Sequence, residues 1–328
     1  MLNPHESTSL LVEGGGSHTW AAVTKGERIL AEAQLPTLNS IGSPAEAQLA
    51  LLSQVAAAAR GAATVDAALF AVGAACTPSY AQEFADLLAE ELPRTLRPEG
   101  CTFVTNDVVP LFFTEGRDAH QLVVIAGTGS GVTARRGFAA VARHGAHEYL
   151  LGDDGGAFDI GRRALRAVIA AEERRGEPTR LTELVACRTG GSEIDRFVYG
   201  SGTPKQTIAD VARDVFAADR AGDRTAQAIL ERSAERLADV CRGALAAVGA
   251  GSAGGAATTV TATLTGSLLT EPSGRLRTRL ERRLRPLGVT TFRPRAVNLP
   301  LLRRTVQGLR SDPAAFDIIA AAVPAVRL

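Results

Sequence analysis

The stretch that decides the fold is LLVEGGGSHTWAAVTKG, residues 10–26, in which three glycines separate two apolar runs. A tight hairpin needs only one or two residues with positive φ, so Gly14, Gly15 and Gly16 exceed what a turn requires. Glycine-rich turns also let backbone N–H groups approach a phosphate closely. The glycines therefore fit either a plain β-hairpin or a phosphate-binding loop, and the carboxylate of Glu13 stands directly before them.

Around this hairpin, the first third of the chain predicts strands followed by alternating helices and strands. One helix is opened by Ser43-Pro44, with Glu46 completing a capping box, and another runs from Pro78 to Glu91. This order is typical of an α/β domain that begins with a β-meander. The expected strands are 8–13, 17–24, 28–34, 67–76 and 101–107.

The pattern then restarts at 121–144, QLVVIAGTGSGVTARRGFAAVARH. This segment aligns with the sequence of the first hairpin at a constant offset. In this alignment Gly15 matches Gly129 and Gly16 matches Ser130. A recurrence of strand order and glycine spacing indicates an internal duplication. The elements expected after it are helices at 155–175, 204–217 and 223–248, and a strand at 258–269 that runs into a glycine turn.

Composition and charge narrow the class of protein. The chain has 328 residues, of which 45% are hydrophobic and 22% charged, with a net charge of +1. These values are typical of a soluble globular protein. A net charge close to zero creates no overall electrostatic field that would attract nucleic acid or an acidic membrane. The four cysteines are scattered and form no zinc-ligand pattern, and the N-terminus has no signal-peptide pattern. We therefore expect a cytoplasmic protein with neither nucleic acid nor membrane as partner.

Three further motifs accompany the first hairpin: AGTGS at 126–130, LLGDDGGAFDIGRRAL at 150–165 and LTGS at 264–267. In this order the four motifs resemble the N-acetylglucosamine kinase and BadF/BadG-type ATPase family, within the acetate and sugar kinase/Hsc70/actin superfamily. The resemblance covers nearly the whole chain. It implies an α/β fold of two duplicated actin-like (ribonuclease H-like) domains with a ligand cleft between them.

The domains expected from this resemblance are 1–115 and 116–328, and the C-terminal helix PAAFDIIAAAVPAV is expected to pack back on the first domain. The implied activity is ATP-dependent phosphorylation of a hydroxyl of an amino sugar or N-acetylhexosamine, with Mg²⁺, by a homodimer. The resemblance thus favours the phosphate-binding reading of the glycines. The implied phosphate- and nucleotide-binding residues are Gly14, Gly15, Gly16, Ser17, Gly127, Thr128, Gly129, Ser130, Gly266 and Ser267.

Phosphoryl transfer needs a carboxylate beside the acceptor hydroxyl, and VTNDVVP supplies Asp107 at the end of a predicted strand. By resemblance Asp107 is the general base, although its residue type also suits a helix N-cap. Turn formation alone would explain Asn39, and Asp153 could cap the helix that begins near Gly155. The residues implied to contact the sugar are Asn39, Asn106, Asp107, His147, Glu148 and Asp153.

Two departures from the family pattern qualify the expected function. Glu13 stands where the resemblance implies an aspartate that organises hydrated Mg²⁺, so we expect Glu13 to act on the metal through water. The segment 145–148, Gly-Ala-His-Glu, replaces Gly-Gly-Trp-Gly and predicts a more polar acceptor pocket. The alternatives are a sugar- or nucleotide-binding protein without catalysis, and an ATPase that activates a partner enzyme through clustered cysteines.

Overall fold

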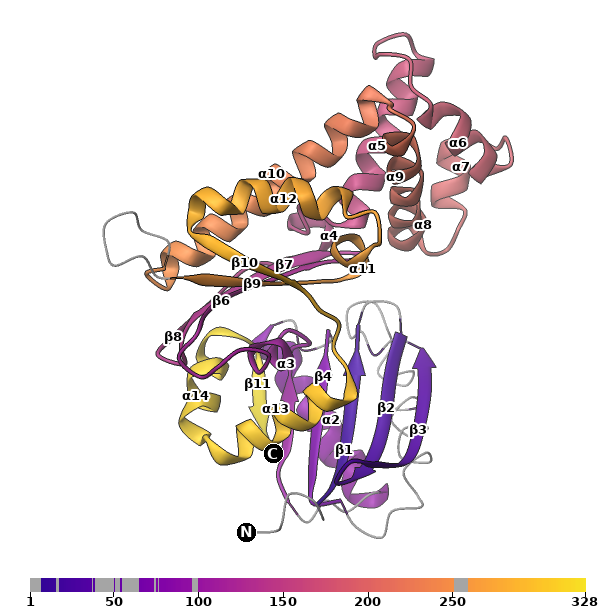
Figure 1. Ribbon diagram of the computed structural model, residues 1–328. Helices are drawn as coiled ribbons and strands as arrows, with labels where there is room; N and C mark the ends of the chain where they lie inside the picture. The colour runs from indigo at the N-terminus through magenta and orange to yellow at the C-terminus, as the bar shows by residue number, and fades with distance from the viewer. Residues whose placement is uncertain are drawn as a thin grey trace. The chain divides into compact units, whose positions relative to one another are not determined.

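The computed structural model describes residues 7–15, 18–36, 38, 50, 54, 65–73, 75, 77–95, 100–250 and 259–328. The chain forms two compact units (Figure 1). The first unit comprises Met1–Ala119, Arg135–Ala142 and Val297–Leu328, and the second comprises His120–Ala134 and Arg143–Ala296. Within the described ranges, no helix is long and apolar enough to cross a membrane.

The first unit is built on a six-stranded sheet with the order β11-β5-β4-β1-β2-β3. β1, β4 and β5 are parallel to one another, so their carboxyl ends meet at one edge of the sheet, whereas β2 is antiparallel to both β1 and β3. The strands are β1 (Thr8–Gly14), β2 (His18–Lys25), β3 (Arg28–Pro36), β4 (Ala67–Val72), β5 (Thr102–Thr105) and β11 (Ala325–Arg327).

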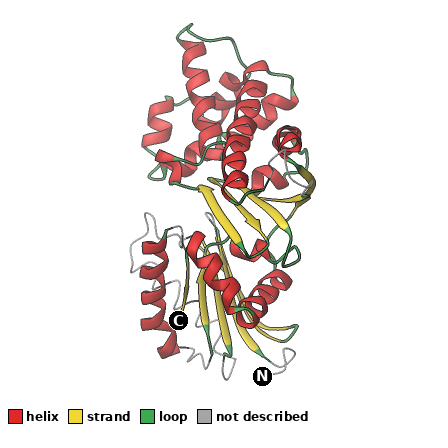
Figure 2. Cartoon of the chain, turned by 90° about the vertical axis from the view of Figure 1, so that its left-hand side faces the viewer, coloured by secondary structure: helices red, strands yellow, loops and turns green. Residues whose placement is uncertain are grey.

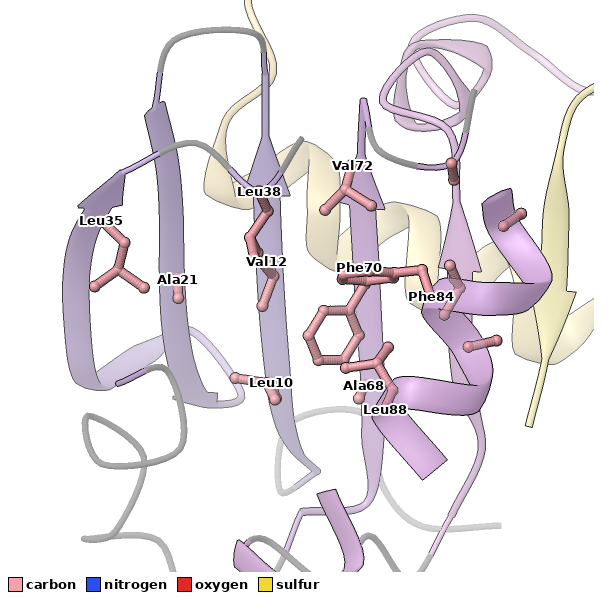
Figure 3. Packing of buried hydrophobic residues seen from close by; sticks show 14 of the residues in the cluster. Leu10, Val12, Ala21, Leu35, Leu38, Ala68, Phe70, Val72, Phe84 and Leu88 are labelled. Carbon is pink, nitrogen blue, oxygen red and sulfur yellow. The ribbon is translucent and has the colours of Figure 1, made fainter. Parts of the chain in front are cut away.

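One face of this sheet carries the apolar core shown in Figure 3. Side chains alternate between the two faces of a strand, so Val12 and Ala21 lie on this face with Phe70 of β4. Helix α2 (Pro78–Thr95) covers the face, and its Phe84 meets Phe70 edge-to-face with 6.2 Å between ring centroids. Because Leu10 and Val12 of β1 face this core, Leu11 and Glu13 project from the opposite face of the sheet.

The C-terminal part of the chain completes the first unit. Helix α13 (Leu299–Ser311) packs on β1 and β4, and helix α14 (Pro313–Ala322) leads into β11, which pairs with β5. Asn298 caps α13 by accepting a hydrogen bond from the Leu301 amide at 3.0 Å. This segment contacts the same strands whose ends carry Glu13 and Asp107.

Arg135 is the largest side chain in the described chain that is fully buried. Its guanidinium donates to the carbonyl oxygens of Phe112 at 3.0 Å and Gly116 at 2.9 Å, and also to those of Arg117 and Glu115. Burial lowers the pKa of Arg135 to about 10, against the opposing effect of Glu115 and Asp118, so it remains charged at neutral pH. One side chain thus fixes the loop that follows α3 (Val109–Phe112).

We expect Arg135→Lys to destabilise the protein by about 2–3 kcal/mol, because an ammonium cannot serve several carbonyls as the planar guanidinium does. Urea unfolding of the variant measures this loss, with Arg136→Lys at the exposed neighbouring position as the matched control. Equal stability of the two variants would contradict the role given to Arg135.

The second unit repeats the sheet of the first. Its strand order, β10-β9-β6-β7-β8, matches β5-β4-β1-β2-β3 strand for strand, which is the topology expected of an internal duplication. β9 is parallel to both β6 and β10, as β4 is to β1 and β5. The strands of this sheet are β6 (His120–Ala126), β7 (Ser130–Arg136), β8 (Ala140–Gly145), β9 (Val260–Thr265) and β10 (Val289–Pro294). The end of β7 and the start of β8 fall within Arg135–Ala142, which belongs to the first unit.

The helices of the second unit gather on one side of its sheet (Figure 2). α10 packs on β6, and α5 packs against α6, α8, α9 and α10. The helices are α4 (Glu148–Leu151), α5 (Ala157–Glu172), α6 (Leu181–Thr189), α7 (Ile194–Tyr199), α8 (Pro204–Asp210), α9 (Ala212–Arg220), α10 (Arg224–Ala247), α11 (Ser267–Thr270) and α12 (Arg275–Leu284).

Several expectations from the sequence differ from these elements. The single helix expected at 204–217 is two helices that meet at Val211, and the strand expected over 67–76 ends at Val72. The sequence analysis missed β10, α13 and β11. Of the region of the helix expected after Ser43, only residues 50 and 54 are described, and both are helical. The expected domains, 1–115 and 116–328, also differ from the two units, because 135–142 and 297–328 belong to the first unit.

Candidate active site

In the first unit, the candidate site lies at the carboxyl ends of β1, β4 and β5. Glu13 and Gly14 end β1, Gly73 follows β4, and Asp107 comes two residues after β5. The Gly73 amide donates to the Gly14 carbonyl at 2.6 Å. A Cβ atom on Gly73 would lie 3.8 Å from Oδ2 of Asp107. The structure therefore brings the start of the first glycine hairpin and the expected base to one place.

The glycine hairpin itself is tightly packed at its first residue. A Cβ atom on Gly14 would lie 3.1 Å from Oγ1 of Thr19 and 3.2 Å from Cγ1 of Val72, so a side chain there would push against both strands. The Gly15 amide donates to the His18 carbonyl at 3.1 Å and closes the turn. Three other expected site residues, Gly16, Ser17 and Asn39, lie outside the described residues.

Glu13 is electrostatically perturbed. Burial, and to a lesser extent the negative charge of Asp107, raises the pKa of Glu13 to about 7. A cation at this edge would oppose both effects, since it favours the ionised carboxylate. Mg²⁺ is commonly held by one or two carboxylates, with phosphates and water completing its shell. Glu13 fits such a role as a single carboxylate. The described residues contain no cluster of three or more His, Cys, Asp or Glu that could hold a metal without phosphate and water.

The raised pKa of Glu13 predicts a pH-dependent stability in metal-free protein. The folded state holds the proton up to about pH 7, whereas the unfolded chain releases it near the ordinary value of 4.5. Stability is therefore lost as the pH rises through this window, by about 1–3 kcal/mol for a shift of this size. Glu13→Gln carries no ionisable group there and should escape the loss.

Urea unfolding at pH 5 and pH 8, with a chelator present, measures the effect. We expect Glu13→Gln to gain stability relative to the wild type between these two pH values. Glu32→Gln, an exposed carboxylate on β3, is the matched control and should run parallel to the wild type. A Glu13→Gln profile that also runs parallel would show that the folded protein does not perturb Glu13.

Asn106 holds the turn that carries Asp107. Its Nδ2 donates to the Ala75 carbonyl at 3.1 Å, and its Oδ1 accepts from the Val108 amide at 3.2 Å. Both ends of the buried amide are thus used to join the end of β5 to the loop after β4. Asn106 is therefore a positioning residue for Asp107, and its expected contact with sugar stays a prediction.

In the second unit, the second glycine hairpin rests on the N-terminus of α5. The Ala157 and Phe158 amides of α5 donate to the carbonyls of Gly127 and Thr128, at 2.8 and 3.1 Å. The hairpin is closed by a bond of 2.9 Å from the Gly127 amide to the Gly129 carbonyl. The backbone carbonyls of the hairpin thus satisfy helix amides that would otherwise lack partners.

Ser130 ties this hairpin to the GDDGG segment. Its amide donates to Oδ1 of Asp153 at 3.0 Å, and its hydroxyl donates to the Asp154 carbonyl at 2.8 Å. A Cβ atom on Gly129 would lie only 2.4 Å from Oδ2 of Asp153, so a side chain there would displace the Asp153 carboxylate. The structure brings the second hairpin and Asp153 together within this unit.

The LTGS motif joins the same cluster. Gly266 has φ +87°, and a Cβ atom there would lie 2.4 Å from the carbonyl oxygen of Ala126, the residue before the hairpin. A Cβ atom on Gly127 would lie 3.9 Å from Oγ of Ser267. The expected adenosine-side residues therefore lie beside the expected phosphate loop, as a nucleotide site in this unit requires.

Asp153 is buried, and its backbone has the left-handed φ of +58°. Burial raises its pKa; Glu148 acts in the same direction, while the Ser130 amide and the positive charges of Lys205 and Arg143 oppose the rise. Asp153 does not cap α5, because the N-cap residue is Gly156 and no side chain caps it. The carboxylate instead accepts from the second hairpin.

His147 and Glu148 lie at the start of α4. Glu148 has φ +63° and pairs with Lys205 across 2.5 Å, and the Lys205 ammonium also lies 5.1 Å from the centre of the Tyr149 ring. Sequence reasoning missed Lys205. Its rarity was the available signal, since the chain has only one other lysine, Lys25. Sugar contacts by His147 and Glu148 stay predictions.

Comparison with known proteins defines the class and then the family. The structure is similar to a candidate N-acetylglucosamine kinase from Porphyromonas gingivalis, with TM-score 0.69 and 20% identity over 93% of this chain and 99% of that one. A candidate N-acetylglucosamine kinase from Chromobacterium violaceum gives TM-score 0.68 and 20% identity, with the same coverage of both chains. The protein thus has the two-domain actin-like α/β fold, in which each unit contains one copy of the duplicated sheet.

The model of the BadF/BadG/BcrA/BcrD ATPase family matches residues 12–273. The chain therefore belongs to this family. A stretch of 154 residues, 46% of the chain, is 29% identical to an N-acetylmuramic acid/N-acetylglucosamine kinase from Clostridium acetobutylicum. The match spans 50% of that relative, so the chain covers about half the length of the curated protein it matches.

Proposed function

We propose that the protein is an ATP-dependent kinase that phosphorylates a hydroxyl of an amino sugar or N-acetylhexosamine. The observation that carries the proposal is the meeting of Asp107 with Glu13 and Gly14 at one sheet edge. A carboxylate beside a glycine hairpin supplies the two things that phosphoryl transfer to an alcohol needs, a base and a phosphate cradle. The partial match to an N-acetylmuramic acid/N-acetylglucosamine kinase supports the choice of acceptor.

In the proposed reaction, Asp107 accepts the proton of the acceptor hydroxyl while that oxygen forms a bond to the terminal phosphorus of ATP. The bond from this phosphorus to the bridging oxygen breaks, and ADP leaves. Asn106 holds the turn on which Asp107 sits, through its bonds to Ala75 and Val108. The residues of the first hairpin from Gly14 to Ser17 donate to the phosphates.

The proposal also assigns nucleotide-binding residues to the second unit. The hairpin from Gly127 to Ser130 binds phosphate, and Gly266 and Ser267 bind on the adenosine side. In our proposal Asp153 turns toward the sugar while Ser130 holds its other oxygen. Asn39, His147 and Glu148 complete the proposed acceptor contacts.

Magnesium is part of the proposal. Glu13 would hold the hydrated ion through water, beside the first hairpin. When bound with ATP, Mg²⁺ neutralises charge that develops on the phosphate oxygens. The chain's own contribution is the carboxylate of Glu13, placed one residue before the hairpin.

Sugar-dependent release of ADP tests the function. Wild-type protein with Mg·ATP is assayed against N-acetylglucosamine, N-acetylmuramic acid, N-acetylmannosamine, glucosamine and glucose, and without sugar. We expect ADP release that requires one or more of the first four sugars. Sugar-independent release would instead indicate an ATPase that activates a partner, and no release with nucleotide bound would indicate a binding protein.

The cysteines argue against the partner-activating alternative within the described chain. Cys101 follows α2, Cys187 lies on α6 and Cys241 lies on α10, and all three are free thiols. They form no group that could hold an iron–sulfur centre, and Cys76 lies outside the described residues.

The remaining parts of the proposal concern assembly and location. We propose a homodimer that works in the cytoplasm, with sugar and ATP as its ligands and neither nucleic acid nor membrane as partner. Light scattering on the purified protein measures the mass. A mass of about twice the 34.2 kDa chain is expected, and a monomer at micromolar concentration would overturn the dimer.

A further inference from the structure

A pocket of about 330 Å³ opens beside Glu13 in the first unit. Its walls come from β1, β2, β3 and the start of α13, all within that unit. We call it the Trp20 pocket, after the single tryptophan of the chain. Its lining residues are Glu13, His18, Trp20, Gln34, Val297, Asn298, Leu299 and Leu302.

The floor of the pocket is a row of side chains that crosses three strands. Trp20 stands directly opposite Glu13 of β1 and directly opposite Gln34 of β3. Residues that are opposite one another in neighbouring strands project from the same face. This is the face opposite the apolar core, because Ala21 and Leu35, the next residues along their strands, belong to that core.

The other wall is apolar and fixed. Leu302 is fully buried on the first turns of α13, and Leu299 stands at the start of the same helix. Asn298 is held by its own capping bond to the Leu301 amide. The pocket therefore combines an indole ring and leucine side chains with amide, imidazole and carboxylate groups at its rim.

This combination selects a neutral ligand with one apolar surface and a polar edge. Among the lining residues only His18 can carry a positive charge, and Glu13 is a carboxylate, so a phosphorylated or otherwise anionic ligand is disfavoured. The pocket lies at the small end of the usual range for small-molecule sites. A pyranose ring matches it, because its C–H face stacks on an aromatic ring while its hydroxyls bond to the rim.

Glu13 lines this pocket and also belongs to the place of the proposed reaction, whereas Trp20 lies farther from Asp107. In the sheet order β5-β4-β1-β2, the strand of Trp20 is three strands away from the strand that precedes Asp107. At about 4.8 Å per strand, this separation is about 14 Å, which is longer than one sugar ring. A ring on Trp20 is therefore a different ring from one whose hydroxyl reaches Asp107.

We infer that the Trp20 pocket is a saccharide subsite that binds a neutral pyranose ring, apart from the ring that would be phosphorylated. The choice of saccharide as ligand rests on the proposed function, whereas the pocket itself rests on the geometry of β1, β2, β3 and α13. Gln34 and His18 bond to ring hydroxyls, and Trp20 with the half-buried Leu299 encloses the apolar face.

Tryptophan fluorescence tests the inference, because all indole emission of this chain comes from Trp20. The full-length protein is titrated with N-acetylglucosamine in the absence of nucleotide. We expect a saturable change in emission, with an apparent affinity that falls about 5–10-fold in Gln34→Ala through loss of a hydrogen bond. His18→Ala is a second variant at the rim and should weaken binding in the same way.

The matched control is Gln82→Ala, an exposed glutamine on α2 that lies on the other side of the same sheet. It should titrate as the wild type does. Emission that stays flat with sugar would overturn the inference. So would an affinity that neither Gln34→Ala nor His18→Ala changes, because the signal would then come from sugar bound elsewhere.

Turnover of the wild type with the same sugar, measured in parallel, separates this inference from the proposed function. Saturable fluorescence without ADP release would support the subsite and count against the kinase. Sugar-dependent ADP release with flat fluorescence would support the kinase and overturn the subsite.

Discussion

Asp107→Asn is expected to slow the chemical step by about 10²–10⁴-fold, the usual scale for loss of a general base. The amide has the shape of the carboxylate but cannot accept the proton of the acceptor hydroxyl. Asn106 keeps its bonds to Ala75 and Val108, so the turn and the fold should persist. Single-turnover phosphorylation of the preferred sugar measures the rate, and calorimetry measures the affinity for ADP.

We expect the affinity for ADP to change by less than about threefold, since the proposed base acts on the acceptor. Glu83→Gln makes the same chemical change on the exposed side of α2 and should behave as the wild type. If Asp107→Asn retains turnover within about threefold, Asp107 is not the base. Glu13, the adjacent carboxylate, would then be the first residue to substitute.

The second large effect is expected at Gly266. Alanine there would have to adopt φ +87° and ψ 154°, a region that costs an L-residue about 1–3 kcal/mol. Its Cβ would also lie 2.4 Å from the Ala126 carbonyl, and such overpacking costs a further 1–3 kcal/mol or so. We therefore expect Gly266→Ala to lose about 3–5 kcal/mol of stability and to displace the second hairpin.

Gly190→Ala is a control for a positive φ without a steric clash. Gly190 also has a left-handed φ, +62°, but an added Cβ meets nothing within 4 Å. It should cost only about 1 kcal/mol, the strain of the left-handed region alone. Urea unfolding followed by circular dichroism compares the two variants, and ADP binding reports on the hairpin. Similar losses in both would mean that the contact of Gly266 with Ala126 does not matter.

Local signals were enough to predict much of the fold. The three strands of the first meander were expected at 8–13, 17–24 and 28–34, and β1, β2 and β3 lie at Thr8–Gly14, His18–Lys25 and Arg28–Pro36. Alternating apolar residues and glycine turns carry this information along the chain itself. The matched hairpins predicted an internal duplication, and the shared strand order of the two sheets agrees with it.

The missed elements depend on longer-range contacts or on weak signals. β11 is three residues long and exists as a strand because it pairs with β5, more than 200 residues earlier. The start of α13 did carry a signal, with Asn298 as cap and Pro300 in the first turn. β10 has the β-branched residues of a strand, but it is short and lies next to the arginine-rich α12.

The residues of the candidate site divide in the same way, into those that local motifs mark and those that depend on contacts far apart in the sequence. Asp107 and the two hairpins could be found from motifs, because each motif is local. The burial of Arg135 could not be predicted, since its partners are main-chain carbonyls about 20 residues earlier in the chain. The pairing of Glu148 with Lys205 joins residues 57 positions apart. The Trp20 pocket needs three strands and a C-terminal helix at once.

The most direct test of the kinase proposal is detection of the product itself. Wild-type protein is incubated with Mg·ATP and N-acetylglucosamine, N-acetylmuramic acid or glucosamine, and the mixture is examined by ³¹P NMR and mass spectrometry, beside Asp107→Asn at equal concentration. The account predicts a sugar phosphate formed in equal amount to ADP by the wild type, and at least about 100-fold more slowly by Asp107→Asn. ADP formed together with inorganic phosphate, and no phosphorylated sugar, would contradict it.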